Sequence, residues 1–316
     1  MERMRVLVTG ATGFVGGRLV PALLAAGHEV TALVRDAGRY DAPAGVRVLE
    51  GDLLEPGSFD AALDVDAAYY LVHSMGAGED FAARDRRAAR NFARAASAAG
   101  IERVVYLSGL GDEEDDLSEH LRSRREVERV LATGEYDLTV LRAAVIVGAG
   151  SISFELVTQL VKRLPVMVTP RWVFTPCQPI AISDVVAYLV GVLETPETAG
   201  ETFDVGGPEV LSYAEMLRRT GRLRGWTPRL LPVPVLTPRL SSLWVGLVTD
   251  VDTVVARELI EGLRNPVVAR DARIRELLPV ELTPFDEAVA RAFAERRGDR
   301  DASVPAEAVP DPVEER

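Results

Sequence analysis

Short apolar runs alternate with longer amphipathic stretches through the first half of the chain. The apolar runs predict β-strands at residues 6–9, 29–34, 46–50, 67–72, 104–108 and 138–142. The amphipathic stretches predict helices at residues 18–26, 57–63, 80–99 and 118–133. Strands that alternate with helices form a parallel sheet with helices on both faces. We therefore predict an α/β fold, a Rossmann-type doubly wound parallel sheet whose strands present ligand sites at their carboxyl ends.

The regular alternation ends near residue 148, and the pattern beyond it indicates a smaller, mainly helical C-terminal lobe. One short strand is predicted at residues 202–205, and a helix is predicted from Ser212, with Glu215 at the capping-box spacing. Further helical patterns cover residues 154–163, 183–193, 241–248, 252–263, 271–278 and 284–297. Residues 298–316 are rich in Pro, Asp, Glu and Ala and lack periodicity, which predicts a disordered acidic tail.

Glycines follow the first predicted strand at a spacing that suits a dinucleotide. Gly10 allows a tight turn, Gly13 lets the backbone approach a pyrophosphate, and Gly16 lets the helix pack closely on the strand. The N–H groups at the start of the helix then face the phosphates. An ordinary strand-to-helix turn is the alternative. The predicted cofactor-binding turn comprises Gly10, Ala11, Thr12, Gly13, Phe14, Val15 and Gly16.

This turn sets the expected domain organisation. Residues 1–148 are predicted to form an NAD(P)-binding Rossmann domain. Residues 149–297 are predicted to form the C-terminal lobe, interleaved with the first domain and completing a substrate pocket.

The end of the second strand bears on the choice between NAD and NADP. Sites for NAD usually place Asp or Glu there to bind the ribose hydroxyls, whereas this chain has Val34 followed by Arg35. A guanidinium matches a 2′-phosphate in charge and geometry, so we predict NADP, and Asp36 leaves NAD open. After the third strand, Asp52 and Leu53 are assigned to the adenine side of the site. Capping of the next helix is the alternative for Asp52.

The composition limits the class of protein. The chain has 316 residues and a net charge of −12, which argues against nucleic acid as a partner. No signal-peptide pattern precedes the first strand, and no run reaches the roughly 18 apolar residues of a membrane span, so we expect a cytoplasmic protein. Cys177 is the single cysteine and is expected to be a small apolar group. We expect no metal site and leave the oligomeric state open.

Several runs of residues together resemble the short-chain dehydrogenase/reductase superfamily. The glycine turn, the run Gly51-Asp52-Leu53 and the strand-end Ser108 match motifs that are general to that superfamily. The runs at residues 70–76, 141–150 and 206–213 are more specific and resemble the atypical, YbjT-like and NmrA-related NAD(P)-binding proteins. The resemblance covers about residues 4–295 and implies a nicotinamide cofactor and hydride transfer. It also implies that epimerisation of nucleotide sugars is disfavoured, because that activity relies on a Tyr that this chain lacks.

The resemblance also locates a catalytic pair on the helix after the fifth strand. There the superfamily has a proton-donating Tyr and, four residues later, a Lys that lowers the pKa of the Tyr and holds the ribose. This chain has His120 and Arg124 at the matching positions, on one helical face. In one interpretation His120 is the general acid, Ser108 positions the substrate carbonyl and Arg124 anchors the cofactor. In the other, the chain binds NAD(P) without efficient turnover and acts as a redox sensor or an assembly or regulatory protein.

Other side chains have less specific interpretations. His73 follows the fourth strand and could contact cofactor or substrate, or make a structural hydrogen bond. The charged run of residues 84–90 is expected to be a solvated helix face, and Asn91 is expected to bond a neighbouring loop. Apolar runs at residues 230–236 and 243–248 favour an apolar substrate such as a carbonyl compound or quinone, although core packing or a membrane- or subunit-facing patch also explains them. We predict an atypical NAD(P)H-dependent oxidoreductase with an unidentified apolar substrate.

Overall fold

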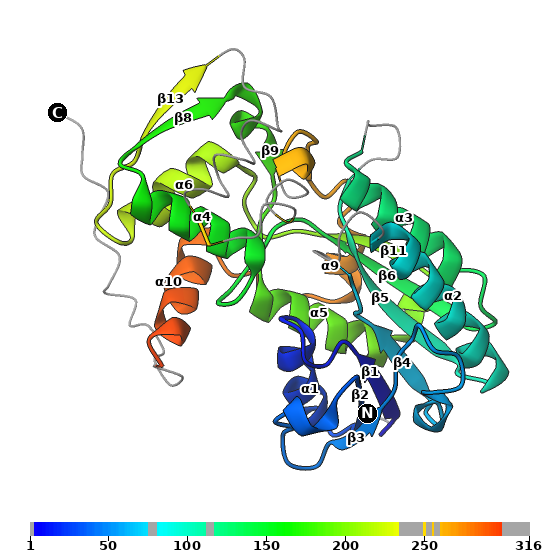
Figure 1. Ribbon diagram of the computed structural model, residues 1–316. Coiled ribbons are helices and arrows are strands. Elements are labelled where there is room, and N and C mark those ends of the chain that lie inside the picture. Colours follow the sequence, from blue (N-terminus) through cyan, green and yellow to red (C-terminus); the bar gives the residue numbers. More distant parts are fainter. Residues whose placement is uncertain are drawn as a thin grey trace.

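A seven-stranded parallel sheet forms the centre of the computed structural model, which describes residues 3–74, 81–111, 117–233, 249–250, 255 and 260–298. The strand order is β11-β6-β5-β4-β1-β2-β3, and every pairing in the sheet is parallel. This order confirms the predicted doubly wound sheet (Figure 1). The strands are β1 (Arg5–Thr9), β2 (Glu29–Val34), β3 (Arg47–Glu50), β4 (Ala67–Tyr70), β5 (Arg103–Gly109), β6 (Asp137–Ala143) and β11 (Thr202–Val205).

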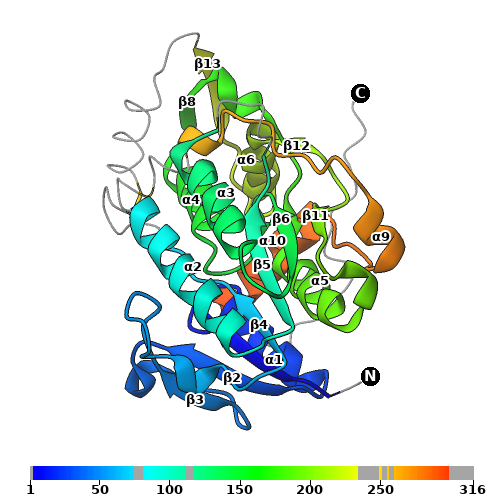
Figure 2. The ribbon, with the colours of Figure 1, turned by 90° about the vertical axis from the view of Figure 1, so that its right-hand side faces the viewer.

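Helices cover both faces of the sheet, as Figures 1 and 2 show. Helices α1 (Gly16–Ala25) and α5 (Ile182–Glu194) lie on one face, and α2 (Phe81–Ala98) and α3 (Glu119–Leu131) lie on the other. Successive side chains of a strand point to opposite faces, so Val6 and Val8 pack with the α1 and α5 side, while Leu7 packs with the α2 and α3 side. Both faces of β1 are buried, which explains its unbroken apolar run.

The C-terminal lobe combines helices with short two-stranded sheets. Its core includes Cys177, a buried free thiol whose pKa is raised by burial to about 11. The predicted capping box is confirmed, because Ser212 and Glu215 close the start of α6. The longer helices are α4 (Ile152–Arg163), α6 (Tyr213–Arg222) and α10 (Phe285–Arg296), and a short α9 (Arg273–Leu277) packs near β11. The paired strands are β7 (Ile146–Val147) with β10 (Ile180–Ala181), β8 (Val166–Pro170) with β13 (Arg229–Val233), and β9 (Pro176–Cys177) with β12 (Leu211–Ser212).

Several predicted elements differ from the structure. The helix predicted at residues 57–63 is wrong, since only one 3₁₀ turn, Asp60–Ala62, forms there. The fourth strand ends at Tyr70 rather than at residue 72. Segment 182–205, from the second half of the chain, returns to the main sheet, where β11 pairs with β6. This pairing buries both Phe203 and Val205 against the α1 and α5 side.

Some predictions fall on residues outside those that the structure describes. They are the helix at residues 241–248, most of the helix at 252–263, and the acidic tail from residue 299 onward. Among the described residues, none of the helices is both long and apolar enough to cross a membrane.

Candidate cofactor and active site

A cavity of about 1100 Å³ lies where the carboxyl ends of the sheet strands meet the C-terminal lobe. Its lining begins at the glycine turn, continues past the ends of β4 and β5, and extends into the lobe. Many of the predicted site residues therefore share one space, although they are separated by more than a hundred residues in sequence. Those that line the cavity are Gly10, Gly13, Phe14, Val15, Gly16, His73, Ser108, His120 and Arg124.

The glycine turn has the geometry of a phosphate cradle. Gly10 adopts a positive φ of 73°, and a Cβ atom there would lie 2.8 Å from the carbonyl oxygen of Leu71. At Gly16, a Cβ atom would lie 2.2 Å from the carbonyl oxygen of Gly10, so only glycine allows helix and strand to approach this closely. In the described part of the chain, the N–H groups of Phe14 and Val15 have no acceptor. These free donors at the start of α1 fit the pyrophosphate of a dinucleotide.

Arg18 ties the glycine turn to the C-terminal lobe. Its guanidinium donates to the carbonyl oxygens of Phe14 at 2.9 Å and Ala149 at 2.7 Å, and it forms an ion pair with Glu295 of α10. The same guanidinium lies 4.7 Å from the centre of the Phe14 ring. The turn is thus held from the lobe side as well as from the sheet.

The remaining predicted cofactor residues do not line the cavity. Arg35 is exposed just beyond β2, and Ala11 is buried whereas Thr12 is exposed. The carboxylate of Asp52 accepts from the backbone N–H of Leu54 at 2.9 Å, which closes a local turn; the predicted capping of the next helix is wrong, because the 3₁₀ turn that follows begins at Asp60 with Phe59 at its N-cap. Leu53 packs in the core on the α2 side, and its carbonyl oxygen accepts from Asn91 at 2.8 Å. That hydrogen bond confirms the loop-bonding role expected of Asn91.

Asp85 is the site residue that the sequence analysis missed. It lies within the charged run of α2 that was predicted to be solvated, yet its side chain is 2% exposed. Its carboxylate accepts from Nδ1 of His73 at 2.8 Å and from the backbone N–H of Ser74 at 2.9 Å. Burial is the largest single influence and raises the pKa of Asp85, but the hydrogen bonds from His73 and Ser74 and the charges of His73 and Arg124 together outweigh it, so that the pKa lies below its usual range. The feature of the sequence that could have indicated its burial is that Asp85 is a single acidic residue among arginines, on a helix that also carries apolar residues.

His73 and His120 face each other across the cavity wall. Their ring centres are 4.9 Å apart, with the rings edge to face at 63°. Nε2 of His73 and Nδ1 of His120 are buried and have no hydrogen-bond partner among the described residues. Burial lowers the pKa of His73, and the bond to Asp85 offsets part of this shift. Burial, together with His73 and Arg124, lowers the pKa of His120 to about 3, so the His120 imidazole is neutral at neutral pH.

Arg124 and Ser108 complete the sheet side of the site. The Arg124 guanidinium donates to the carbonyl oxygen of Leu107 and lies 4.9 Å from the centre of the Tyr106 ring. Tyr106 in turn donates to the carbonyl oxygen of Arg124 at 3.2 Å. Ser108 is buried at the end of β5 and lines the cavity. Arg124 thus fixes α3 against β5, on the side of the cavity that the glycine turn also lines.

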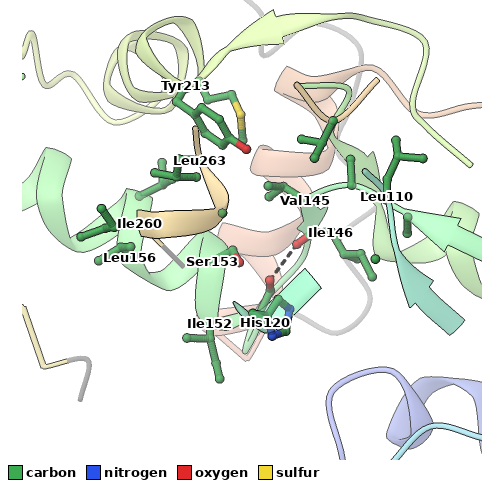
Figure 3. A pocket seen from close by; sticks show the side chains of 18 of the residues that line it. Leu110, His120, Val145, Ile146, Ile152, Ser153, Leu156, Tyr213, Ile260 and Leu263 are labelled. Carbon is green, nitrogen blue, oxygen red and sulfur yellow. Dashed lines mark hydrogen bonds between the residues drawn. The ribbon is translucent and has the colours of Figure 1, made fainter. Parts of the chain in front are cut away.

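The lobe side of the cavity is apolar. Figure 3 shows the side chains of the lobe gathered around the space that His120 borders. The apolar and aromatic residues on this side include Leu156, Leu160, Val166, Met167, Val168, Trp172, Tyr213, Met216, Leu217, Ile260 and Leu263. A large apolar chamber that opens onto the carboxyl ends of parallel strands is where α/β folds bind ligands.

Sequence comparison places residues 10–166 in the family described as NAD(P)H-binding. A ceramide reductase of Caulobacter vibrioides is 27% identical over 304 residues, which cover 93% of this chain and 90% of that protein. A (4-alkanoyl-5-oxo-2,5-dihydrofuran-3-yl)methyl phosphate reductase of Streptomyces griseus is 30% identical over 230 residues, which cover 70% of this chain and 74% of that protein. These relatives are reductases, in agreement with the predicted atypical oxidoreductase.

Solved structures show the same architecture. The enzyme WbmG of Bordetella bronchiseptica, in complex with NAD and UDP, superimposes with a TM-score of 0.72 at 18% identity. The match covers 94% of this chain and 96% of that chain. The solved structure shows the fold, and the family match and the Streptomyces griseus relative show that the chain belongs to the NAD(P)H-binding family of atypical short-chain dehydrogenase/reductase-like proteins.

Proposed function

We propose that this chain is an NADPH-dependent reductase of an apolar, lipid-like carbonyl compound. The observation that carries the proposal is the continuous cavity, which joins the glycine turn to an apolar chamber in the lobe. Its volume of about 1100 Å³ is at the upper end of the range for small-molecule sites. The ceramide reductase relative, matched over almost its full length, is named for a lipid substrate.

Different residues around the cavity would bind the cofactor, donate the proton and orient the substrate in a reduction. The glycine turn and the start of α1 would hold the pyrophosphate, and Arg35 would hold the 2′-phosphate of the adenosine ribose. NADPH, when bound, would supply the hydride that reduces the carbonyl carbon of the substrate. His73 would donate a proton from its Nε2 to the carbonyl oxygen, so that the product would be an alcohol and the oxidised cofactor NADP⁺. The buried Ser108 hydroxyl would orient the carbonyl.

His73 suits the role of proton donor better than His120, the residue that aligns with the superfamily Tyr. A protonated imidazole in a buried site needs a negative partner, and Asp85 provides one at 2.8 Å from Nδ1 of His73. His120 has no carboxylate partner among the described residues, and its surroundings lower its pKa to about 3. We therefore assign proton transfer to His73, orientation of His73 to Asp85, and a neutral, space-filling role to His120.

Replacement of Arg35 by serine is expected to weaken NADPH binding by about 10–100-fold and to leave NADH binding unchanged. A hydrogen bond to a charged group contributes about 1.5–3 kcal/mol, and NADH lacks the 2′-phosphate that receives it. Titration of the purified protein with each cofactor measures the effect. Arg47→Ser is the matched control, because Arg47 is an exposed arginine on the neighbouring strand β3. Equal losses for NADPH and NADH in Arg35→Ser would contradict the assignment.

The size of the apolar chamber predicts a preference for long alkyl chains. Each buried CH₂ group contributes about 0.8 kcal/mol, so kcat/KM for a series of 3-oxo alkyl amides should rise about fourfold per methylene until the chamber is full. Oxidation of NADPH followed at its absorbance band measures the series. A flat dependence on chain length would overturn the lipid-like substrate. Tight NADPH binding without turnover of any carbonyl or quinone would favour the non-catalytic sensor instead.

A further inference from the structure

The acidic residues of this chain are unevenly distributed. The chain has 48 Asp and Glu residues, yet none lies between Glu155 and Asp184, and none lies between Glu215 and Asp250. Both stretches carry basic residues instead. These are Lys162, Arg163, Arg171, Arg218, Arg219, Arg222, Arg224, Arg229 and Arg239. In a protein with a net charge of −12, two basic stretches without a single carboxylate indicate a local surface of opposite sign.

The fold brings these two stretches together in one structure. Strand β8 comes from the first and β13 from the second, and they pair in parallel. Figure 1 shows this ribbon protruding from the lobe, at the end of the molecule far from β3, and Figure 2 agrees. The β8–β13 ribbon therefore projects from the described part of the region that lacks acidic residues.

One face of the β8–β13 ribbon carries exposed aliphatic side chains. Val166 is 47% exposed, Val168 is 49% exposed and Leu231 is 52% exposed. Val166 is paired with Arg229, and Val168 with Leu231, so all four side chains share one face of the pleat. Met167, between the two valines, is buried on the other face. Exposed valine and leucine at adjacent ladder positions form an apolar patch that water does not favour.

Basic side chains flank this patch. Lys162 ends α4 just before β8, Arg171 follows β8, and Arg229 lies within β13; all three are exposed. Within the described ranges, none of these three side chains pairs with a carboxylate. Arg163 differs from them, because it forms an ion pair with Asp250. The patch is thus a cluster of aliphatic side chains that is flanked along the chain by three basic residues without a carboxylate partner in the described ranges.

We propose that the β8–β13 ribbon binds the surface of a membrane that contains anionic phospholipids. Lys162, Arg171 and Arg229 would contact the headgroups while Val166, Val168 and Leu231 enter the interface, the arrangement by which proteins lie on a bilayer without spanning it. Nucleic acid also attracts basic residues, but the aliphatic residues between the charges favour lipid.

The position of the β8–β13 ribbon also bears on how a substrate enters the cavity. Val166 and Val168 line the cavity and are also about half exposed, so the patch lies directly beside the cavity. An apolar substrate could then pass from the bilayer into the chamber without crossing water. The inference goes beyond the proposed reaction, and membrane binding is measurable whichever carbonyl compound is reduced.

Co-sedimentation with lipid vesicles tests the proposal. The full chain should bind phosphatidylcholine vesicles that contain phosphatidylglycerol, bind vesicles of phosphatidylcholine alone much more weakly, and dissociate as the salt concentration rises. The variant Lys162→Gln/Arg171→Gln/Arg229→Gln should lose about fivefold in affinity for each charge removed. Leu231→Ser should also weaken binding, because it removes an apolar contact without a change in charge.

Matched controls come from the rest of the surface. Val210→Ser removes a valine that is 53% exposed, and Arg47→Gln removes an exposed arginine on β3; neither should change vesicle binding. NADPH affinity should be the same in all five proteins, which shows that each is folded. Equal binding to both kinds of vesicle, or binding to neither, would overturn the proposal. So would a dimer that the ribbon substitutions dissociate while vesicle binding stays unchanged, since the patch would then be a protein interface.

Discussion

Replacement of His73 by alanine is expected to lower kcat for carbonyl reduction by about 10²–10⁴-fold, the usual contribution of a positioned general acid. The residue lies at the end of the β4 segment, lines the cavity and is held by Asp85. NADPH binding should be unchanged, because in the proposed site the phosphates contact the glycine turn and Arg35 and not His73. Steady-state kinetics and a cofactor titration on the same preparation separate the two effects.

His120→Ala is the matched comparison for this experiment. Both histidines line the cavity, and their rings are in contact, but only His73 has a carboxylate partner among the described residues. We expect His120→Ala to keep most of kcat. If His120→Ala abolishes turnover and His73→Ala does not, the proton donor is the residue that aligns with the superfamily Tyr, and the assignment to His73 is wrong.

The pH dependence of the rate gives a second test of the His73 and Asp85 pair. Burial lowers the pKa of His73 below its ordinary value of 6.5, so the protonated form becomes more populated as the pH falls. The rate of reduction should therefore rise as the pH is lowered from 8 toward 6. Asp85→Asn removes the group that raises the pKa of His73, and its pH–rate profile should move to lower pH. An Asp85→Asn profile identical to that of the wild type would show that Asp85 has only a structural role.

Replacement of Gly16 by alanine is expected to destabilise the fold by about 1–3 kcal/mol, the usual cost of adding an atom to a closely packed site. The added Cβ would lie 2.2 Å from the carbonyl oxygen of Gly10 and 2.8 Å from Cα of Ala11. Both neighbours are backbone atoms of the cofactor turn, so the turn must move, and NADPH affinity should fall with stability. Thermal unfolding and cofactor titration measure the two losses.

Gly17→Ala is an adjacent control with the opposite expected sign. A Cβ atom at Gly17 would meet its nearest neighbour, the carbonyl oxygen of Ala11, at an ordinary 3.7 Å. Because Gly17 lies within α1, alanine there should stabilise the protein by about 0.5–1 kcal/mol. Equal stability of the Gly16→Ala and Gly17→Ala variants would show that the close approach at Gly16 is not required.

Most of the glycine turn, the part of the site expected to bind the cofactor, could be predicted from the sequence. Its signals are local: the apolar run of β1, the glycines that follow it within seven positions and the start of α1 form one continuous segment. Backbone conformation and close packing restrict these positions to glycine whatever the rest of the chain does. The same locality explains why the remaining strands of the first domain were placed within about two residues.

The pair of His73 and Asp85 could not be predicted in the same way. Asp85 stands among arginines on α2, and its neighbours in sequence do not show which residue its carboxylate contacts. Asp85 is buried because its face of α2 packs toward the end of β4. In that position its carboxylate contacts His73, which lies 12 residues earlier in the chain. The pKa of His120 likewise depends on burial and on neighbours from other elements.

The sequence by itself determined the Rossmann architecture and the dinucleotide turn, because hydrophobic periodicity and glycine positions act over short stretches of chain. Only the tertiary structure decided what surrounds the cofactor. Packing of the lobe against the strand ends created the apolar chamber, and pairing of β8 with β13 joined the two stretches that lack acidic residues. These features arise from contacts between residues far apart in sequence, whose partners are set by the folded packing and not by any local pattern.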